Sequence, residues 1–152
     1  MRQTIPPLAL SIGDPAGIGP EIILRSWAEA QAEAQAKAMP EFVVVGGGTI
    51  LKAAAEALNI DAPIERIESV EEASKTFGHA IPVLDIGESG SDYTPGTPSE
   101  SGATLALQSL AEATRLALQS KASAIVTAPV SKAQLAKVGF EFPGQTEFFA
   151  AA

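Results

Sequence analysis

The sequence has 152 residues, of which 46% are hydrophobic, and this composition favours a folded domain over a disordered chain. Its net charge of -8, from 10 basic and 18 acidic residues, argues against nucleic acid or an anionic membrane as partner, since both attract clustered Lys and Arg. No apolar run approaches the roughly 20 residues of a membrane span. The acidic charge thus favours a small molecule or another protein as partner. The absence of cysteine excludes a disulfide framework and fits a cytoplasmic protein.

The most constrained segment is the loop over residues 11–21, which follows an apolar strand predicted over residues 8–12. Asp14 precedes Pro15, whose ring pushes the preceding residue toward extended geometry. Pro20 suits the first turn of a helix, where its missing N–H would have been unpaired anyway. At the carboxyl end of a strand, such a loop indicates that a ligand or a neighbouring domain comes close. We therefore expect Asp14 to line a cleft.

The glycines of this loop do not follow a known phosphate-binding order. Gly13, Gly17 and Gly19 read G-x-x-x-G-x-G rather than G-x-G-x-x-G, and no Lys-Ser or Lys-Thr follows as in a P-loop. Glu21, in the first helical turn, would compete with an anion for the helix end. We interpret the loop as a tight structural turn and keep phosphate binding by its backbone as the alternative. Three further glycines at 46–48 are interpreted as a plain turn.

Apolar strands alternate with helical patterns through most of the chain. This order predicts a layered α/β fold with a largely parallel sheet flanked by helices. Asn59 is expected to close the second helix in the left-handed conformation. The predicted strands are residues 8–12, 42–45, 64–67, 82–85 and 124–127, and helices are predicted over residues 20–38, 49–58 and 98–120, with one turn between 67 and 82 and a short helix from 132.

Two helix starts carry the capping-box pattern, a Ser or Thr followed three residues later by Glu or Gln. Thr97 with Glu100 marks the long helix, with Pro98 at its first position, and Ser131 with Gln134 marks the short one. Spacing of three and four residues predicts the buried face of the long helix. That face consists of Leu107, Leu110, Thr114, Ala117 and Leu118.

The last residues read as an apolar helix over 147–152 capped by Thr146. A helix of about two turns is marginal alone in water and needs a surface to pack against. We therefore expect the sequence to be the amino-terminal portion of a longer protein.

Few side chains have a sequence context that indicates ligand binding, metal binding or acid–base catalysis. Lys132 follows the cap of a helix, where a cation is unfavourable by several tenths of a kcal/mol, so a bound anion or simple solvation is expected there. His79, the only histidine, has no neighbours at metal-ligand spacing and is expected at the surface. Asp14 and Asp85 both follow strands and could reach the same sheet edge.

Four motifs, in this order, carry a family resemblance. They are residues 13–21 (GDPAGIGPE), 101–103 (SGA), 127–132 (TAPVSK) and 142–147 (FPGQTE). Together they resemble the 4-hydroxythreonine-4-phosphate dehydrogenase family of pyridoxal phosphate biosynthesis. The resemblance covers the whole chain, somewhat less than half of a typical member. It implies a two-domain α/β fold related to the isocitrate and isopropylmalate dehydrogenases, with the second domain starting near residues 129–152.

The resemblance also implies an activity. Family members work as homodimers and oxidise the secondary alcohol of 4-phosphooxy-L-threonine with NAD, after which the β-keto acid loses carbon dioxide. A divalent metal (Zn, Mg or Co) polarises the reacting oxygens, and its three histidine ligands lie beyond residue 152, so no metal ligand is expected in this chain.

The family's substrate contacts fall on Gln145 and Thr146, while Asp14 and Lys132 are candidates for lining the cleft. Gln145 stands where the family has histidine, and an amide cannot titrate near neutral pH. Two alternatives stay open. One is a related metal-dependent dehydrogenase for another phosphorylated hydroxy acid or a dihydrodiol, and the other is a binding module without catalysis.

Overall fold

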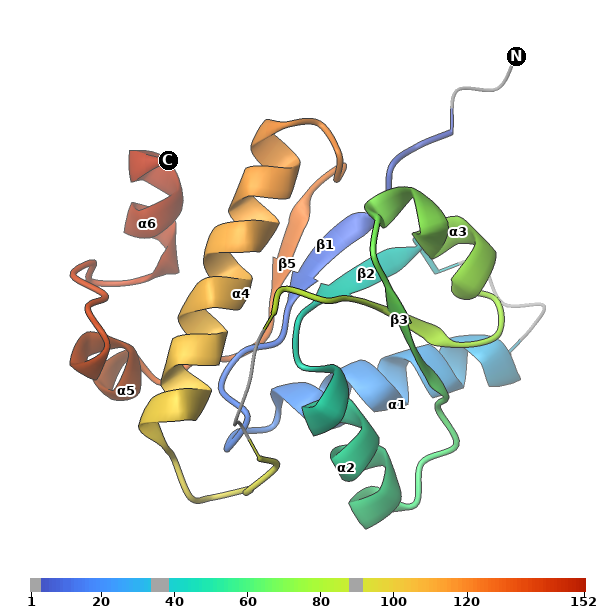
Figure 1. The fold of residues 1–152 in the computed structure, drawn as a ribbon, viewed down its shortest axis with the longest axis horizontal. Helices are drawn as coiled ribbons and strands as arrows, with labels where there is room; N and C mark the ends of the chain where they lie inside the picture. Colours follow the sequence, from blue (N-terminus) through green and yellow to red (C-terminus); the bar gives the residue numbers. More distant parts are fainter. Residues whose placement is uncertain (1–3, 34–38, 88–91) are drawn as a thin grey trace.

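A computed structural model describes residues 4–33, 39–87 and 92–152. Its centre is a five-stranded parallel sheet with the strand order β3-β4-β2-β1-β5 (Figure 1). The predicted α/β fold with a parallel sheet is confirmed. The strands are β1 (Leu8–Ser11), β2 (Phe42–Val45), β3 (Ile64–Ile67), β4 (Ile81–Leu84) and β5 (Ile125–Thr127).

Helices cover both faces of this sheet. Because successive side chains of a strand point to opposite faces, each buried strand is apolar throughout. The helices are α1 (Gly19–Ala32), α2 (Gly48–Leu58), α3 (Ala73–Thr76), α4 (Glu100–Leu118), α5 (Lys132–Lys137) and α6 (Gln145–Ala151), with a 3-10 turn, η1 (Val70–Glu72), before α3. In β2, Phe42 and Val44 belong to the core shared with α1 and α2, while Val43 and Val45 belong to the core shared with α3 and α4.

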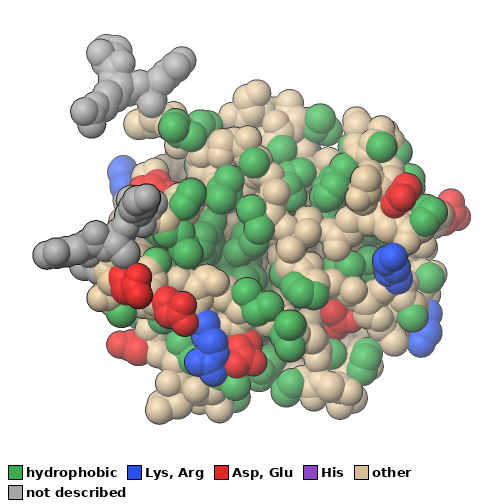
Figure 2. Space-filling model, turned by 180° about the vertical axis from the view of Figure 1, so that it is seen from behind, with side chains coloured by type: hydrophobic (Ala, Val, Ile, Leu, Met, Phe, Trp, Pro, Cys, Tyr) green, Lys and Arg blue, Asp and Glu red, His purple; other side chains and the backbone are tan. Residues whose placement is uncertain are grey.

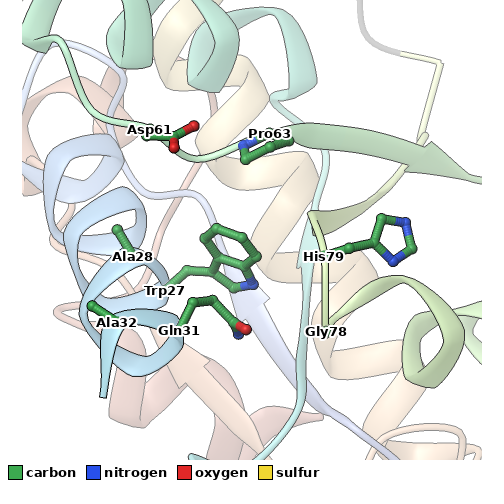
Figure 3. A pocket seen from close by; sticks show the side chains of 8 residues that line it. All are labelled: Trp27, Ala28, Gln31, Ala32, Asp61, Pro63, Gly78 and His79. Atoms are coloured by element: carbon green, nitrogen blue, oxygen red, sulfur yellow. The ribbon is translucent and has the colours of Figure 1, made fainter. Parts of the chain in front are cut away.

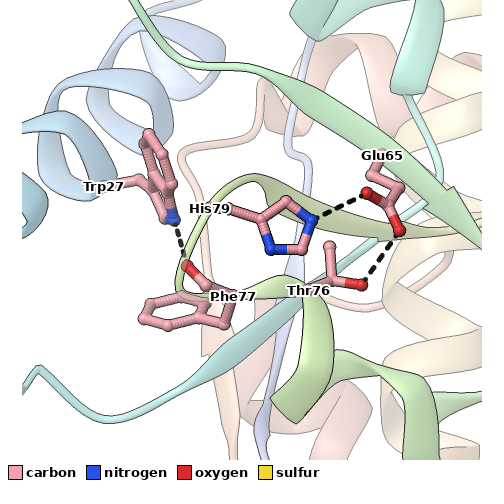
Figure 4. Close-up of polar contacts among 5 residues, drawn as sticks. All are labelled: Trp27, Glu65, Thr76, Phe77 and His79. Carbon is pink, nitrogen blue, oxygen red and sulfur yellow. Dashed lines mark hydrogen bonds and ion pairs between the residues drawn. The ribbon is translucent and has the colours of Figure 1, made fainter.

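A hydrogen bond from Trp27 connects α1 to the amino-terminal edge of the sheet. Its indole N–H donates a hydrogen bond to the carbonyl of Phe77 at 3.0 Å (Figure 4). Nearby, the carboxylate of Glu65 accepts from the Thr76 hydroxyl at 3.2 Å and pairs with His79 at 3.0 Å. The predicted surface position of His79 is confirmed. The predicted helical turn between β3 and β4 is also confirmed, as η1 and α3.

Strand β5 is more exposed than predicted. Its residues were expected to be buried, but β5 pairs only with β1, at the edge of the sheet, and Val126 is 42% exposed. An apolar run alone does not separate a central strand from an edge strand.

Helix α4 starts later than predicted. Thr97 and Pro98 lie outside it, and Ser99 is the cap, with its hydroxyl accepting from the N–H of Gly102 at 3.1 Å. Thr97 is used instead in a turn, where its N–H donates to the carbonyl of Thr94 at 3.0 Å. The predicted cap at Ser131 is confirmed, since its hydroxyl accepts from the N–H of Gln134.

The buried face of α4 is also shifted. Leu110 and Thr114 are buried as predicted, but Leu118 is 67% exposed, and Leu107 and Ala117 are half-buried. The helix packs on the sheet and on α5, so its covered surface is wider than one stripe. The buried residues of α4 are Gly102, Ala103, Leu105, Ala106, Ser109, Leu110, Ala113, Thr114 and Leu116.

The two remaining helix ends differ from prediction by a few residues. Helix α6 begins at Gln145 with Gly144 as its cap, so Thr146 lies in the first turn instead of capping the helix. Helix α1 ends at Ala32, and residues 34–38 of the predicted helix lie outside the described residues. Asn59 closes α2 with φ 52° and ψ 46°, which confirms its predicted left-handed conformation. No helix among the described residues is long and apolar enough to cross a membrane.

Candidate functional site

The first three sequence motifs lie close together at the carboxyl edge of the sheet. The loop after β1, the segment leading into α4 and the segment after β5 together surround a hollow of about 340 Å³. In α/β proteins with parallel sheets, ligands bind at this edge, outside the carboxyl ends of the strands. The hollow is lined by Asp14, Ala16, Gly17, Ile18, Gly96, Pro98, Pro129, Val130 and Ser131.

Asp14 lines this hollow but also holds its own loop. The residue is only 6% exposed, and its carboxylate accepts a hydrogen bond from the N–H of Ala16 at 2.9 Å. Its backbone N–H donates to the carbonyl of Pro129 at 3.1 Å, which joins the first motif to the third. A carboxylate that closes a turn in this way organises the backbone around it. Its role toward a ligand stays a prediction.

Two glycines of the opening loop are required by close packing. Gly13 has φ +71°, and a Cβ there would lie 2.5 Å from the carbonyl oxygen of Pro129. A Cβ on Gly19 would lie 2.8 Å from the carbonyl oxygen of Ile12. Both positions therefore face protein atoms. The contacts therefore support the interpretation of this loop as a structural turn.

The second motif joins this packing through Gly102. A Cβ at that position would lie 3.3 Å from the ring of Pro15 and 3.1 Å from the Ser99 hydroxyl. The glycine thus lets the first turn of α4 approach the opening loop closely. Three motifs that are far apart in sequence are therefore in direct contact.

The glycine turn after β2 is filled by apolar side chains. Gly46 and Gly47 have φ of +76° and +78°, so both adopt the left-handed conformation that glycine tolerates best. A Cβ on Gly46 would lie 2.9 Å from the side chain of Ile86, and one on Gly47 would lie 2.9 Å from that of Ile12. These contacts support the interpretation of the segment as a plain turn.

The fourth motif lies beside Lys132. The Cε and Nζ atoms of this exposed lysine are 3.9 Å from the place that a Cβ on Gly144 would take, and Oε2 of Glu147 is 3.1 Å from the same place. Gln145 is half-buried and Thr146 is exposed. The Oε1 atom of Gln145 is buried and has no hydrogen-bond partner among the described residues. The structure thus brings Lys132 close to Gly144, the residue before the two predicted substrate contacts, and the roles of all three side chains stay predictions.

Asp85 takes no part in this arrangement. It follows β4, which is separated from β1 by β2, and it lies 3.6 Å from the guanidinium of Arg66. Its carboxylate also accepts from the N–H of Gly87 at 2.8 Å. The structure therefore does not bring Asp85 and Asp14 together in the hollow.

Metal ligands are not grouped in the described part of the chain. No three His, Cys, Asp or Glu side chains among residues 4–33, 39–87 and 92–152 are placed to hold an ion. His79 directly precedes β4 and therefore lies at the amino-terminal edge of the sheet, which is opposite the edge that carries the hollow. The described residues therefore do not form a metal site by themselves.

Two further depressions were not predicted from sequence. The first is an apolar groove of about 420 Å³ beside β5, on the face covered by α1, where hydrophobic side chains surround a hollow (Figure 2). The second is an open pocket of about 510 Å³ between α1 and the loops before β3 and β4 (Figure 3). Trp27, Gln31, Asp61 and His79 contribute to the second pocket.

A parallel sheet covered on both faces, with constrained loops at its carboxyl edge, defines an α/β domain of the kind that binds ligands outside the carboxyl ends of its strands. A family model described as "Pyridoxal phosphate biosynthetic protein PdxA" matches residues 38–152. The chain belongs to this family.

Individual relatives agree with the family model. The chain is 51% identical over 146 residues to a 4-hydroxythreonine-4-phosphate dehydrogenase of Erythrobacter litoralis, covering 96% of this chain and 42% of that relative. The corresponding protein of Zymomonas mobilis is 43% identical over 144 residues, with 95% and 40% covered. The chain thus spans about two fifths of the length of these relatives.

Solved structures show the same fold. The chain matches a 4-hydroxythreonine-4-phosphate dehydrogenase from Burkholderia phymatum with a TM-score of 0.83 and 32% identity, over 98% of this chain and 44% of the other. A terephthalate 1,2-cis-dihydrodiol dehydrogenase from Burkholderia xenovorans matches with a TM-score of 0.66 and 24% identity, over 93% and 40%. The second likeness concerns the fold alone.

Proposed function

We propose that the complete protein is a dehydrogenase that oxidises 4-phosphooxy-L-threonine with NAD, with decarboxylation, in the biosynthesis of pyridoxal 5'-phosphate. The observation that carries this proposal is the 51% identity, over nearly the whole chain, to a relative of that name. The contacts among the first three family motifs, and the position of the fourth motif near Lys132 of the third, support it. We further propose that the protein is cytoplasmic and works as a homodimer.

The proposed reaction uses groups outside the described residues. When bound, NAD accepts a hydride and a divalent metal (Zn, Mg or Co) polarises the reacting oxygens. The family resemblance assigns the ligands for that metal to sequence beyond residue 152. The residues of this chain bind and orient the substrate.

Gln145 is the proposed contact for a donor group of the substrate. Its Oε1 is buried and without a partner, and a buried acceptor is stabilised by any N–H or O–H that reaches it. The substrate offers a hydroxyl and an ammonium group. Thr146, on the next position of α6, adds a hydroxyl that donates or accepts. Lys132 supplies a positive charge beside them for the substrate's phosphate or carboxylate.

The experiment that tests this function is an NADH assay. The natural polypeptide that contains this sequence is incubated with 4-phosphooxy-L-threonine, NAD and Zn²⁺, Mg²⁺ or Co²⁺, and absorbance of NADH is followed. We expect metal-dependent turnover, and we expect residues 1–152 alone to be inactive. Absence of turnover with every metal, in protein that is folded by circular dichroism, would contradict the proposal and favour a binding module.

The Gln145→His variant tests the role of the substituted position. An imidazole can exchange a proton near neutral pH, whereas an amide cannot, so the variant should acquire a pH dependence of KM between about pH 6 and 7. The matched control is Gln108→His, at an exposed position on α4. Identical pH profiles for both variants would show that Gln145 does not contact the substrate.

A second candidate is a related dehydrogenase for another phosphorylated hydroxy acid or for a dihydrodiol. The replacement of the family histidine by Gln145 favours this candidate, because a changed side chain at a substrate contact alters which substrates are accepted. A panel of hydroxy acids and dihydrodiols, compared by kcat/KM with 4-phosphooxy-L-threonine, separates the two candidates.

A further inference from the structure

Ser109 is a buried polar residue in the middle of α4, on the side that faces β1 and β2. Its side chain is fully buried, at 0% exposure. The hydroxyl accepts a hydrogen bond from the backbone N–H of Ile12 at 3.0 Å and donates one to the carbonyl of Val45 at 2.6 Å. One side chain of α4 therefore joins the ends of two neighbouring strands.

These two backbone groups lie where β1 and β2 separate. The pairing of the strands ends at Ser11 opposite Val45. Beyond it, Ile12 leads into the opening loop and Val45 leads into the glycine turn. Both residues are fully buried, so water does not reach their polar groups. Buried N–H and C=O groups are almost always hydrogen-bonded in proteins, and here the Ser109 hydroxyl serves both of them.

The opening loop has further anchors, and one lies at its start, where the carbonyl of Ser11 accepts a hydrogen bond from the N–H of Ala128 at 3.2 Å. The N–H of Asp14 donates to the carbonyl of Pro129, and the carbonyl of Ala16 accepts from the N–H of Gly96 at 2.8 Å. The anchor at Ser109 is the side-chain hydrogen bond that joins the start of the loop to α4. A change at this point loosens Ile12, which precedes the residues of the loop that line the hollow.

We propose that Ser109 is a positioning residue of the active site, which holds the opening loop against the carboxyl edge of the sheet through Ile12 and Val45. This inference rests on the proposed function, because the hollow is the place where the substrate or its cofactor is expected. Ser109 does not line the hollow itself and acts through the backbone of the loop.

A second buried hydroxyl on the same helix provides a matched control. Thr114 is also buried, but its hydroxyl donates to the carbonyl of Leu110 at 2.8 Å, within α4. It has no hydrogen bond to the opening loop. Removing either hydroxyl takes one polar group out of α4, and only the change at Ser109 releases the strand ends.

The test compares Ser109→Ala and Thr114→Ala in the natural polypeptide that contains this sequence. Hydrogen exchange at the amide of Ile12 should accelerate about tenfold or more in Ser109→Ala and stay within about twofold of the parent in Thr114→Ala. In the NADH assay, kcat should fall about tenfold in Ser109→Ala, with KM changed less, because the loop is misplaced while the contacts at Gln145 remain. Thr114→Ala should retain both constants within about twofold.

Two results overturn the proposal. One is unchanged exchange at Ile12 in Ser109→Ala, and the other is equal kinetic constants for the two variants. If Ser109→Ala does not fold, Ser109→Cys keeps the shape with a weaker hydrogen bond and should show the same changes at smaller size. If the parent itself has no activity, the proposed function fails, while exchange at Ile12 still decides whether Ser109 holds the loop.

Discussion

The opening loop and the α5–α6 segment contain the motifs that identify the family, but they are built differently. The loop is fixed by hydrogen bonds from α4, from the segment after β5 and from the segment before α4. Helix α6 has no buried residue, and its Phe148 packs mainly against other rings, with Phe140 and Phe142 at centroid distances of 5.8 and 5.5 Å. One motif region is part of the core, and the other is a partly exposed aromatic cluster.

This difference separates two uses of motif residues. In the loop, Gly13 and Gly19 are required because a Cβ at these positions would lie 2.5 and 2.8 Å from a backbone carbonyl oxygen. On α6, Thr146 is exposed, and the buried Oε1 atom of Gln145 has no hydrogen-bond partner among the described residues, so the fold does not use this acceptor. A motif read in sequence does not distinguish these uses, whereas the contacts do.

The largest expected effect is that of Gly13→Ala. The new methyl group would meet the carbonyl oxygen of Pro129 at 2.5 Å, at a residue with φ +71°. Steric overlap with backbone adds to the left-handed strain, so we expect a loss of about 3 to 4 kcal/mol in the free energy of unfolding. Urea denaturation measures this loss.

Gly139→Ala is the matched control for this variant. Gly139 has φ +96°, but nothing lies within 4 Å of its Cβ position. The expected loss is only about 1 to 2 kcal/mol, from backbone strain alone. Equal losses for the two variants would show that the loop is not held more tightly than the α5–α6 segment.

The second prediction compares an apolar side chain from each region. Ile12 is fully buried, and Ile12→Ala should lower the free energy of unfolding by about 3 kcal/mol through loss of burial and a remaining cavity. Phe148 is half-buried, and Phe148→Ala should lower it by about 1 kcal/mol. Chemical denaturation of both variants tests the comparison, which is wrong if Phe148→Ala is the more damaging change.

A smaller effect on the free energy of unfolding is expected from the ion pair between Glu112 and Arg115 on α4. The hydrogen bond from Arg115, at 2.8 Å from its Nε, lowers the pKa of Glu112 below its usual 4.5. A depressed pKa stabilises the fold above the unfolded-state value, and that contribution is lost as pH falls through the folded-state value.

Glu112→Gln should therefore lower stability by about 0.3 to 0.5 kcal/mol at pH 7, a small value because the pair is solvent-accessible. The difference from the parent should disappear at pH values well below 4.5. Thermal unfolding at a series of pH values measures it, and a difference that grows toward low pH would contradict the assignment.

The smallest effect is expected at Ser11. Its hydroxyl is buried and has no hydrogen-bond partner among the described residues, in contrast to that of Ser109. Replacing an unsatisfied polar group by a methyl hydrogen removes a desolvation penalty, so Ser11→Ala should change the free energy of unfolding by less than about 0.5 kcal/mol. A loss above 2 kcal/mol in urea denaturation would show that this hydroxyl has an unrecognised partner.

Sequence patterns predicted the parallel sheet well, because the buried strands are continuous apolar runs and turn residues separate them. They failed where two local signals competed. Thr97 and Ser99 both suit a helix start, and only the turn that occupies Thr97 decides between them. The exposure of Val126 depends on the edge position of β5, which is a property of the whole sheet.

The candidate site could be predicted only in part. The motifs identified Asp14, Lys132, Gln145 and Thr146, but a serine inside a helix gives no sign that it bridges two strands. The spacing of Leu105, Ser109 and Ala113 places Ser109 on the buried face, and this pattern was the available signal. Which backbone groups need a partner follows from the register of β1 and β2, which the sequence does not specify.

The most direct test of the account is a crystal structure of the natural polypeptide with 4-phosphooxy-L-threonine bound. The account predicts that Gln145 Oε1 and the Thr146 hydroxyl lie within about 3.2 Å of polar atoms of the substrate, while the glycines at 13 and 19 keep their protein contacts. Substrate phosphate seated on the backbone of the opening loop, with Gln145 and Thr146 free of contact, would contradict it.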